Sequence, residues 1–229
     1  MERVIARAQV SGKQSMNNNI GPSAIRVAIA DDHPIVQRGL KDAMRAHSHL
    51  ELVGTASSFQ ELMAILPSAI PDVLILDLSG MGGAPLPLME RLRREYPELR
   101  VIVFSSFIDL VPEMLKAGAY GYIGKEELDH YLVTAITIVH HGKQFLSPTA
   151  ERYLARSEGQ RGPSELSEQQ ATAVKYAAQG LKTKQIADRM GIDEHTVLNY
   201  ITLAKRKTGH TTRLELIDWY RRNYLGGVG

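Results

Sequence analysis

The sequence predicts an α/β domain with a doubly wound parallel sheet, followed by a small all-helical domain. Aliphatic segments alternate with helical patterns from Ile25 to about Gly142. One segment, Val73–Leu76, is apolar without interruption, as strands buried on both faces are. From Leu166 onward the pattern is wholly helical. These three observations place a sheet domain first and a helical domain second.

Five strands and five helices are expected in the first domain, residues 25–142, because capping or breaking residues follow the strands. The sheet is therefore expected to be five-stranded. The expected strands are 26–30, 51–56, 73–77, 100–104 and 120–123, and the expected helices are roughly 34–46, 58–66, 86–95, 109–117 and 127–141.

The two flanking segments lack these patterns. Residues 1–24 are polar and aperiodic, which predicts a disordered tail, and Met16 is an alternative start to Met1. Residues 143–164 combine prolines and glycines with polar residues, which predicts a linker with a short helical continuation at 149–155.

The second domain, residues 165–229, begins with a capping box formed by Ser167 and Gln170. Its expected helices run to Gln179 and then over 183–190, 194–208 and about 213–224, with glycines ending the first three. Two short helices separated by a glycine turn, the second one longer, are typical of a helix-turn-helix.

Composition excludes several classes of protein. The 229 residues include no apolar run of the roughly 20 residues that a membrane span needs, and no signal-peptide core. Zero cysteines exclude disulfides and thiol chemistry, so we expect a cytoplasmic protein. Residues 25–146 carry 15 acidic against 11 basic residues, whereas residues 163–229 carry 10 basic against 7 acidic. The second domain is therefore the one expected to approach a polyanion.

Polar residues follow the predicted strands at the edge where open α/β sheets bind ligands. Asp77 closes the apolar run, Asp31 and Asp32 follow the first strand, Ser105 follows the fourth, and Lys125 follows the fifth. Carboxylates of this kind hold Mg²⁺, and a cation beside a carboxylate makes it a phosphoryl acceptor. Singly, Asp32 or Ser105 could be a helix cap and Lys125 a solvated lysine. Their conjunction favours a phosphoryl site.

The first domain resembles the receiver domain of bacterial response regulators of the NarL/FixJ type, a flavodoxin-like fold. The resemblance implies that Asp77 takes phosphate from a sensor histidine kinase. It also implies that Asp32 binds Mg²⁺ directly, Asp31 mainly through water, and that Asp77 and the Ser79 carbonyl complete the protein ligands. Ser105 and Tyr122 match the switch residues, and Lys125 matches the phosphate-binding lysine. The matching segments are Ala30–Val36, Arg38–Leu40, Pro71–Leu78 and Gly118–Lys125.

The loop after Asp77 departs from this family. Ser79–Pro87 contains glycines where the family usually has Met-Pro. Glycine widens the backbone freedom of this loop. We therefore expect an unusual lifetime of the acyl phosphate or unusual recognition by the kinase.

The second domain resembles the LuxR-type helix-turn-helix domain. Its matching segments are Leu166–Ser167, Ala178–Leu181, Lys184–Ala187, Met190–Ile192, Thr196–Val197, and Lys207 with Gly209. Basic residues are expected to contact DNA phosphates, Asn199 to read adenine, and Leu198 or Thr202 to touch a thymine methyl. The last helix is expected to form a homodimer contact. The expected DNA-binding residues are Lys182, Thr183, Lys184, Thr196, Leu198, Asn199, Thr202, Lys205, Arg206, Lys207 and Arg213.

The sequence therefore predicts a two-component response regulator that is not an enzyme. It would bind double-stranded DNA and control transcription when a sensor histidine kinase phosphorylates Asp77. An alternative is a phosphorylation-independent or partner-dependent regulator, whose receiver is an interaction module for another regulator. An aspartyl-phosphate phosphatase is disfavoured, because Ser79 stands where such enzymes want a second acid.

Overall fold

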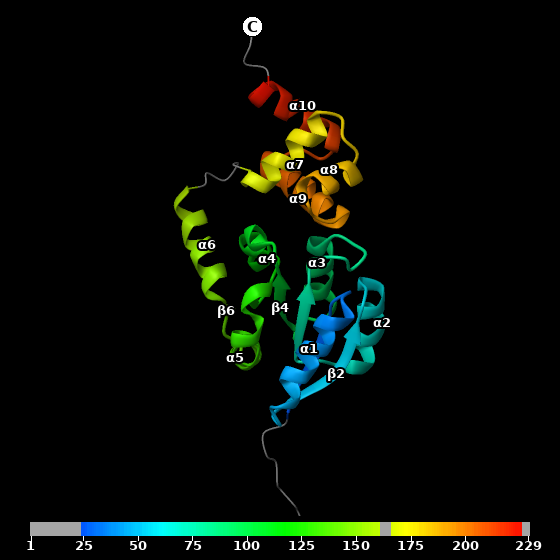
Figure 1. Cartoon of the computed structure of the whole chain (residues 1–229), viewed down its shortest axis with the longest axis vertical. Helices are drawn as coiled ribbons and strands as arrows, with labels where there is room; N and C mark the ends of the chain where they lie inside the picture. Colours follow the sequence, from blue (N-terminus) through cyan, green and yellow to red (C-terminus); the bar gives the residue numbers. More distant parts are fainter. Residues whose placement is uncertain (1–23, 161–165, 226–229) are drawn as a thin grey trace, which may run out of the picture.

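The computed structural model describes residues 24–160 and 166–225, which form a sheet domain and a helical domain (Figure 1). The sheet has six strands in the order β2-β1-β3-β4-β5-β6, and every neighbouring pair is parallel. All five residues of β3 are buried, as the apolar run predicted. The strands are β1 (Ile25–Ala30), β2 (Leu50–Ala56), β3 (Val73–Asp77), β4 (Arg100–Ser105), β5 (Gly121–Gly124) and β6 (Phe145–Leu146).

Helices cover both faces of the sheet, so the fold is doubly wound as predicted. Alternate strand residues such as Ile29 and Ile75 pack with α1 and α5, whereas Leu74 and Leu76 pack with α2, α3 and α4. The elements are α1 (Pro34–Arg45), α2 (Phe59–Ala69), α3 (Pro85–Glu95), η1 (Ile108–Leu110), α4 (Val111–Lys116), η2 (Lys125–Glu127) and α5 (Leu128–His140).

The prediction of five strands was wrong, because a sixth strand lies in the segment after α5, where a linker was expected over residues 143–164. Its residues 145–146 form β6, and α6 (Pro148–Gln160) follows, which includes the expected helical continuation. The Thr149 amide and hydroxyl donate to the Glu127 carboxylate at 3.2 and 3.0 Å, which ties the start of α6 to η2. A two-residue strand carries no periodicity, so only its pairing with β5 reveals it. Residues 1–23 of the expected tail and 161–164 of the expected linker lie outside the described residues.

The helical domain contains the helix-turn-helix. Ser167 and Gln170 form the predicted capping box, and Gly191 and Gly209 end α8 and α9 in the left-handed conformation. Within the described residues, no helix is both long and apolar enough to span a membrane. The helices are α7 (Glu168–Ala178), α8 (Thr183–Met190), α9 (Glu194–Thr208), α10 (Arg213–Tyr220) and the π-helical turn η3 (Arg221–Leu225).

Gly80, in the loop after Asp77, is closely surrounded. Gly80 has φ +62°, and a Cβ on it would stand 1.8 Å from an oxygen of Asp32. The next residue, Met81, is buried, and its carbonyl accepts the Phe59 amide at 2.8 Å. The loop is therefore anchored against α2, and Gly80 is required because a larger residue would displace the Asp32 carboxylate.

Replacing Gly80 by alanine is expected to destabilise the fold more than replacing Gly82. Both glycines have positive φ, and alanine there costs about 1 kcal/mol, but only Gly80 lacks space for a Cβ. Urea unfolding of Gly80→Ala and Gly82→Ala measures the difference. Equal losses of unfolding free energy in the two variants would contradict the close approach of Gly80 to Asp32.

Candidate functional site

Three charged side chains predicted to meet at the carboxyl edge of the sheet are in contact. Asp77, the last residue of β3, is fully buried, and Asp31, just after β1, is 1% exposed. Lys125, which begins η2 after β5, places its Nζ 2.5 Å from Asp77 Oδ2 and 3.6 Å from Asp31 Oδ2. The order β1-β3-β4-β5 brings these strand ends side by side.

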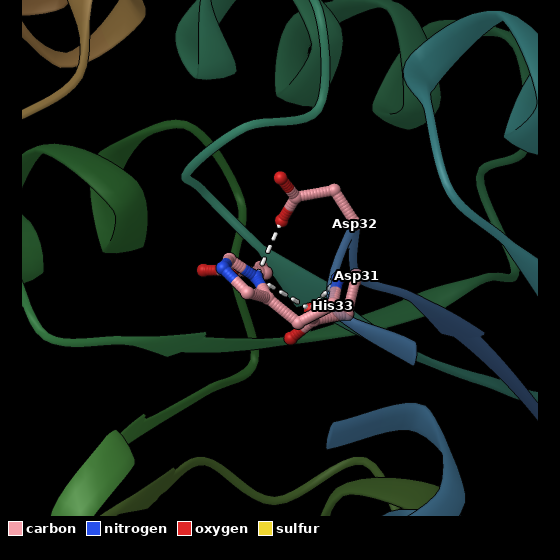
Figure 2. Close-up of side chains that lie close together, drawn as sticks. Asp31, Asp32 and His33 are labelled. Carbon is pink, nitrogen blue, oxygen red and sulfur yellow. Dashed lines mark hydrogen bonds and ion pairs between the residues drawn. The ribbon is translucent and has the colours of Figure 1, made fainter. Parts of the chain in front are cut away.

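Asp32 and His33 form the exposed side of this pocket (Figure 2). His33 Nδ1 lies 2.7 Å from Asp32 Oδ1 and 3.3 Å from Asp31 Oδ1, and the His33 amide donates to Asp31 Oδ1 at 2.7 Å. His33 and not Asp32 is the N-cap residue of α1, and no side chain caps that helix. Asp32 therefore does not cap α1, which was the ordinary alternative for this residue. His33 lies in the matching segment Ala30–Val36, but the sequence pattern assigned it no role.

Burial controls the charge of Asp77. It raises the pKa of this carboxyl from 3.8 to about 6, against the lowering effect of the hydrogen bond and ion pair with Lys125. The neighbouring charge of Asp31 raises the pKa further, and the Ser79 amide, which donates at 3.3 Å, lowers it. The carboxylate form of Asp77 is therefore costly to bury, and an additional cation in the pocket would stabilise it.

The residues of the pocket fit a divalent cation. One ligand atom from each of Asp31, Asp32, His33 and Asp77 can be chosen so that all four lie within 4.8 Å of one another. Asp31 Oδ2 is buried and accepts no hydrogen bond from the described residues. A buried carboxylate oxygen without a donor is costly, and a hard cation satisfies it. Receiver domains generally bind Mg²⁺ at an acidic pocket of this kind.

The two expected switch residues lie together beside the pocket. Ser105 is fully buried, and its Oγ accepts the Phe107 amide at 3.2 Å. Tyr122 is also fully buried; its hydroxyl donates to the Phe107 carbonyl and is hydrogen-bonded to Ser105. Burial raises the pKa of Tyr122 well above its usual range, so it stays a neutral donor. Both side chains thus hold the segment that leads into η1.

The helix-turn-helix does not stand free of the sheet domain. Its second helix, α9, lies across the ends of α3 and α4 (Figure 1). The Tyr200 hydroxyl donates to Asp109 Oδ1 at 3.0 Å, and Lys207 Nζ pairs with Glu113 Oε1 at 2.7 Å. Both pairs are largely buried, whereas the ion pair of Arg206 with Glu90 is half exposed. These contacts could not be predicted, because nothing local in the sequence marks a pairing between domains.

This contact buries part of the expected DNA-reading surface. Asn199 is fully buried, on the same helical stripe as Leu203 and Arg206 one and two turns further on. Neither polar atom of its carboxamide has a hydrogen-bond partner among the described residues. Leu198 is 41% exposed and Thr202 is half-buried. The predicted base-reading residues therefore share α9, but one of them is covered.

The other expected DNA-binding residues are divided between free and engaged side chains. Lys182 and Lys184 are exposed at the start of α8. Arg213 donates to the Thr183 hydroxyl at 3.1 Å and to the Leu181 carbonyl at 3.0 Å, which joins α10 to α8. Thr196 is buried and bonded to the cap residue Asp193, and Lys205 donates to the Thr211 carbonyl at 3.1 Å. For Thr196 and Arg213 the observed contacts are internal to the domain.

The pocket and the helix-turn-helix define a class: a receiver joined to a DNA-binding domain. The response regulator receiver domain family matches residues 27–137, and the luxR family of bacterial regulatory proteins matches residues 164–220. The chain is 34% identical to the DNA-binding transcriptional activator DevR/DosR of Mycobacterium tuberculosis, over 83% of this chain and 91% of the relative. It is 29% identical to the nitrate/nitrite response regulator NarL of Escherichia coli, over 87% and 96% of the two chains.

Solved structures agree with this assignment. A structure of the RcsB response regulator of Salmonella typhimurium has a TM-score of 0.56 and 25% identity, covering 87% of this chain and 99% of RcsB. An RcsB–DNA complex has a TM-score of 0.58 at 25% identity and covers 90% and 100%. The chain therefore belongs to the two-component response regulators with a LuxR-type DNA-binding domain. The predicted family, fold class and general function are confirmed.

Asp77→Asn is expected to be more stable than the wild type at neutral pH without divalent cations. The raised pKa of Asp77 means that the folded chain binds this proton more tightly than the unfolded chain, so stability falls as pH rises from about 4 to about 6. Asparagine avoids this loss, which amounts to about 1 to 3 kcal/mol.

Urea unfolding in EDTA at a series of pH values measures this difference. The advantage of Asp77→Asn should vanish below about pH 4, where Asp77 is protonated. The exposed Asp42→Asn serves as the control, with little effect expected at any pH. An Asp77→Asn variant no more stable than the wild type at neutral pH would contradict the burial cost.

Proposed function

We propose that this regulator is switched by transfer of a phosphoryl group from a sensor histidine kinase to Asp77. An Asp77 carboxylate oxygen forms a bond to phosphorus as the N–P bond of the kinase phosphohistidine breaks, and the imidazole takes up a proton. Lys125 and Ser105 would then hold the phosphoryl oxygens. The contact of Lys125 with both buried acids is the observation that carries the proposal.

Mg²⁺ would be held by Asp31, Asp32, Asp77 and the Ser79 carbonyl. When bound, it neutralises the charge of the carboxylates and the phosphoryl group. Asp31 and Asp32 position it, while Lys125 remains the fixed positive charge of the pocket. The buried Asp31 oxygen without a donor supports this assignment.

The arrangement described above would be the inactive state. DNA cannot reach Asn199 while α9 lies on α3 and α4. In this arrangement Lys207 and Arg206 form ion pairs with acids of the sheet domain. A buried amide without partners costs about 1 to 3 kcal/mol. The Asn199 carboxamide is such a group, and a base edge in the major groove would supply its missing hydrogen bonds. The cost favours a second state in which α9 is released.

A short path of contacts would couple phosphorylation to this release. Ser105 and Tyr122 both bind Phe107, and Asp109 lies two residues further along. Asp109 in turn accepts the Tyr200 hydroxyl of α9. If Ser105 turns to the phosphoryl group, it gives up the Phe107 amide and frees the segment that holds Tyr200.

The released protein would act as a homodimer on double-stranded DNA in the cytoplasm. Leu214 on α10 is 67% exposed, and Tyr224 beyond it is 58% exposed. Exposed apolar side chains near one end of a small domain are suited to a contact between two copies. One RcsB structure contains two dimers bound to two DNAs. The partner could also be another regulator, in which case the receiver would be an interaction module and phosphorylation would be dispensable.

Acetyl phosphate with Mg²⁺ is expected to phosphorylate the wild type and the Asp42→Asn control, but not Asp77→Asn. The reason is that Asp77 lies against Lys125 in the pocket, whereas Asp42 is an exposed residue of α1. Retardation on a phosphate-affinity gel measures the product, and footprinting on selected DNA measures the output. Equal footprints with and without phosphorylation, together with a second regulator that co-purifies, would favour the partner-dependent alternative.

Glu113→Gln is expected to raise DNA affinity without phosphorylation. The change removes the charge that holds Lys207, so the closed state loses stability and the fraction with a free α9 grows. A gain of about tenfold corresponds to about 1.4 kcal/mol. Fluorescence anisotropy with labelled DNA measures it, and Glu98→Gln, an exposed acid before β4, is the control. An unchanged affinity of Glu113→Gln would contradict occlusion by this contact.

A further inference from the structure

We propose that Glu127 is a positioning residue for phosphoryl transfer to Asp77. By binding the start of α6, Glu127 fixes the turn η2 and with it the ammonium group of Lys125. The inference rests on the proposed function, because it takes Asp77 as the phosphoacceptor. It goes further in giving a helix outside the pocket, α6, a part in the geometry of the pocket.

Lys125 is bracketed by two contacts with the same segment of chain. On one side, the Gly124 amide donates to the Ser147 hydroxyl oxygen at 3.3 Å. On the other side, Glu127 Oε1 accepts the Thr149 amide at 3.2 Å and the Thr149 hydroxyl at 3.0 Å. Ser147 is fully buried just before α6, and Thr149 lies in its first turn. The backbone on both sides of Lys125 is therefore held by the junction of β6 and α6.

The turn η2 depends on such support. It has three residues, Lys125–Glu127, and the hydrogen bonds of a 3₁₀ turn are poorer than those of an α-helix. The Lys125 side chain is only 21% exposed, and its Nζ lies 5.2 Å from the centre of the Phe104 ring and 2.5 Å from Asp77 Oδ2. Packing therefore limits how far this side chain can adjust. A shift of η2 moves the ammonium group away from Asp77.

The Glu127 carboxylate does not serve the stability of α6 alone. Its second oxygen, Oε2, is buried and accepts no hydrogen bond from the described residues. A buried carboxylate oxygen without a donor is costly, so a neutral acceptor would cap α6 at lower cost. A Cβ on Gly124 would stand 3.1 Å from Glu127 Oε2. The carboxylate thus lies against the backbone just before Lys125, where it can hold the position of that residue.

Phosphorylation of the full chain by acetyl phosphate with Mg²⁺ tests the inference. We expect Glu127→Ala to lower the maximal rate about tenfold or more with little change in KM, because a displaced charge acts mainly in the transition state. Glutamine keeps an oxygen that accepts from Thr149, so Glu127→Gln should recover most of the rate. Glu126→Ala, an exposed position in the same turn, is the control and should react as the wild type does.

A double-mutant cycle with Lys125→Ala separates positioning from a merely structural role. If Glu127 acts through Lys125, Glu127→Ala has little further effect on the rate in the Lys125→Ala chain, whereas independent losses would multiply. Urea unfolding gives the folded fraction of each variant. Thr149→Val removes one of the two hydrogen bonds to Glu127 and serves if Glu127→Ala does not fold. We expect it to slow the reaction about threefold, as the loss of one hydrogen bond does.

The outcomes for the inference and for the proposed function differ. A wild-type rate in folded Glu127→Ala or in Thr149→Val would overturn the inference and leave phosphorylation of Asp77 intact. Independent losses in the cycle with Lys125→Ala would do the same. A wild type that acetyl phosphate does not phosphorylate at Asp77 would overturn both.

Discussion

The Lys125 ammonium, held between two buried carboxylates, is the interaction on which the rest of the structure depends. Parallel strands deliver Asp31 and Asp77 to one edge of the sheet, where each loses nearly all of its solvent. Two such charges are tolerated because Lys125, from a third strand end, lies against both. The compensation is incomplete, as the raised pKa of Asp77 and the unsatisfied Asp31 oxygen indicate. The pocket therefore favours an additional positive charge, such as that of a divalent cation.

A second constraint links this pocket to the helical domain. The basic excess of the second domain was expected to serve the approach to a polyanion, but part of it pairs with acids of the first domain. Glu113 pairs with Lys207, one of the residues proposed to contact DNA. The Tyr200 hydroxyl donates a hydrogen bond to Asp109. Asp109 lies in the segment that begins with Phe107, whose amide donates to Ser105. Because one face of α9 carries both the contact with the receiver and residues proposed to bind DNA, the receiver and DNA would compete for it.

The sequence was sufficient for the parts of the structure that local chemistry determines. The apolar run before Asp77 and the acids after β1 located the pocket, because parallel topology brings strand ends together. It was insufficient where partners are distant or elements short. The two residues of β6 show no period, and Glu113 looks like any helix-surface acid until α9 covers it. The glycines after Asp77 suggested a loose loop, yet Gly80 is glycine because Asp32 leaves no room for a side chain.

The distance between the two domains shows whether the receiver controls the release of α9. The chain has no cysteine, so a pair of spin labels at Ala64→Cys on α2 and Asp188→Cys on α8, both exposed, would be unique. Double electron–electron resonance then gives the distance distribution with and without beryllium fluoride, a phosphoryl mimic, and Mg²⁺. Release of α9 by the receiver predicts one narrow distribution that becomes longer and broader when the mimic binds, and no such change in a chain that also carries Asp77→Asn. A distribution that is already broad, or one that the mimic leaves unchanged, would contradict it.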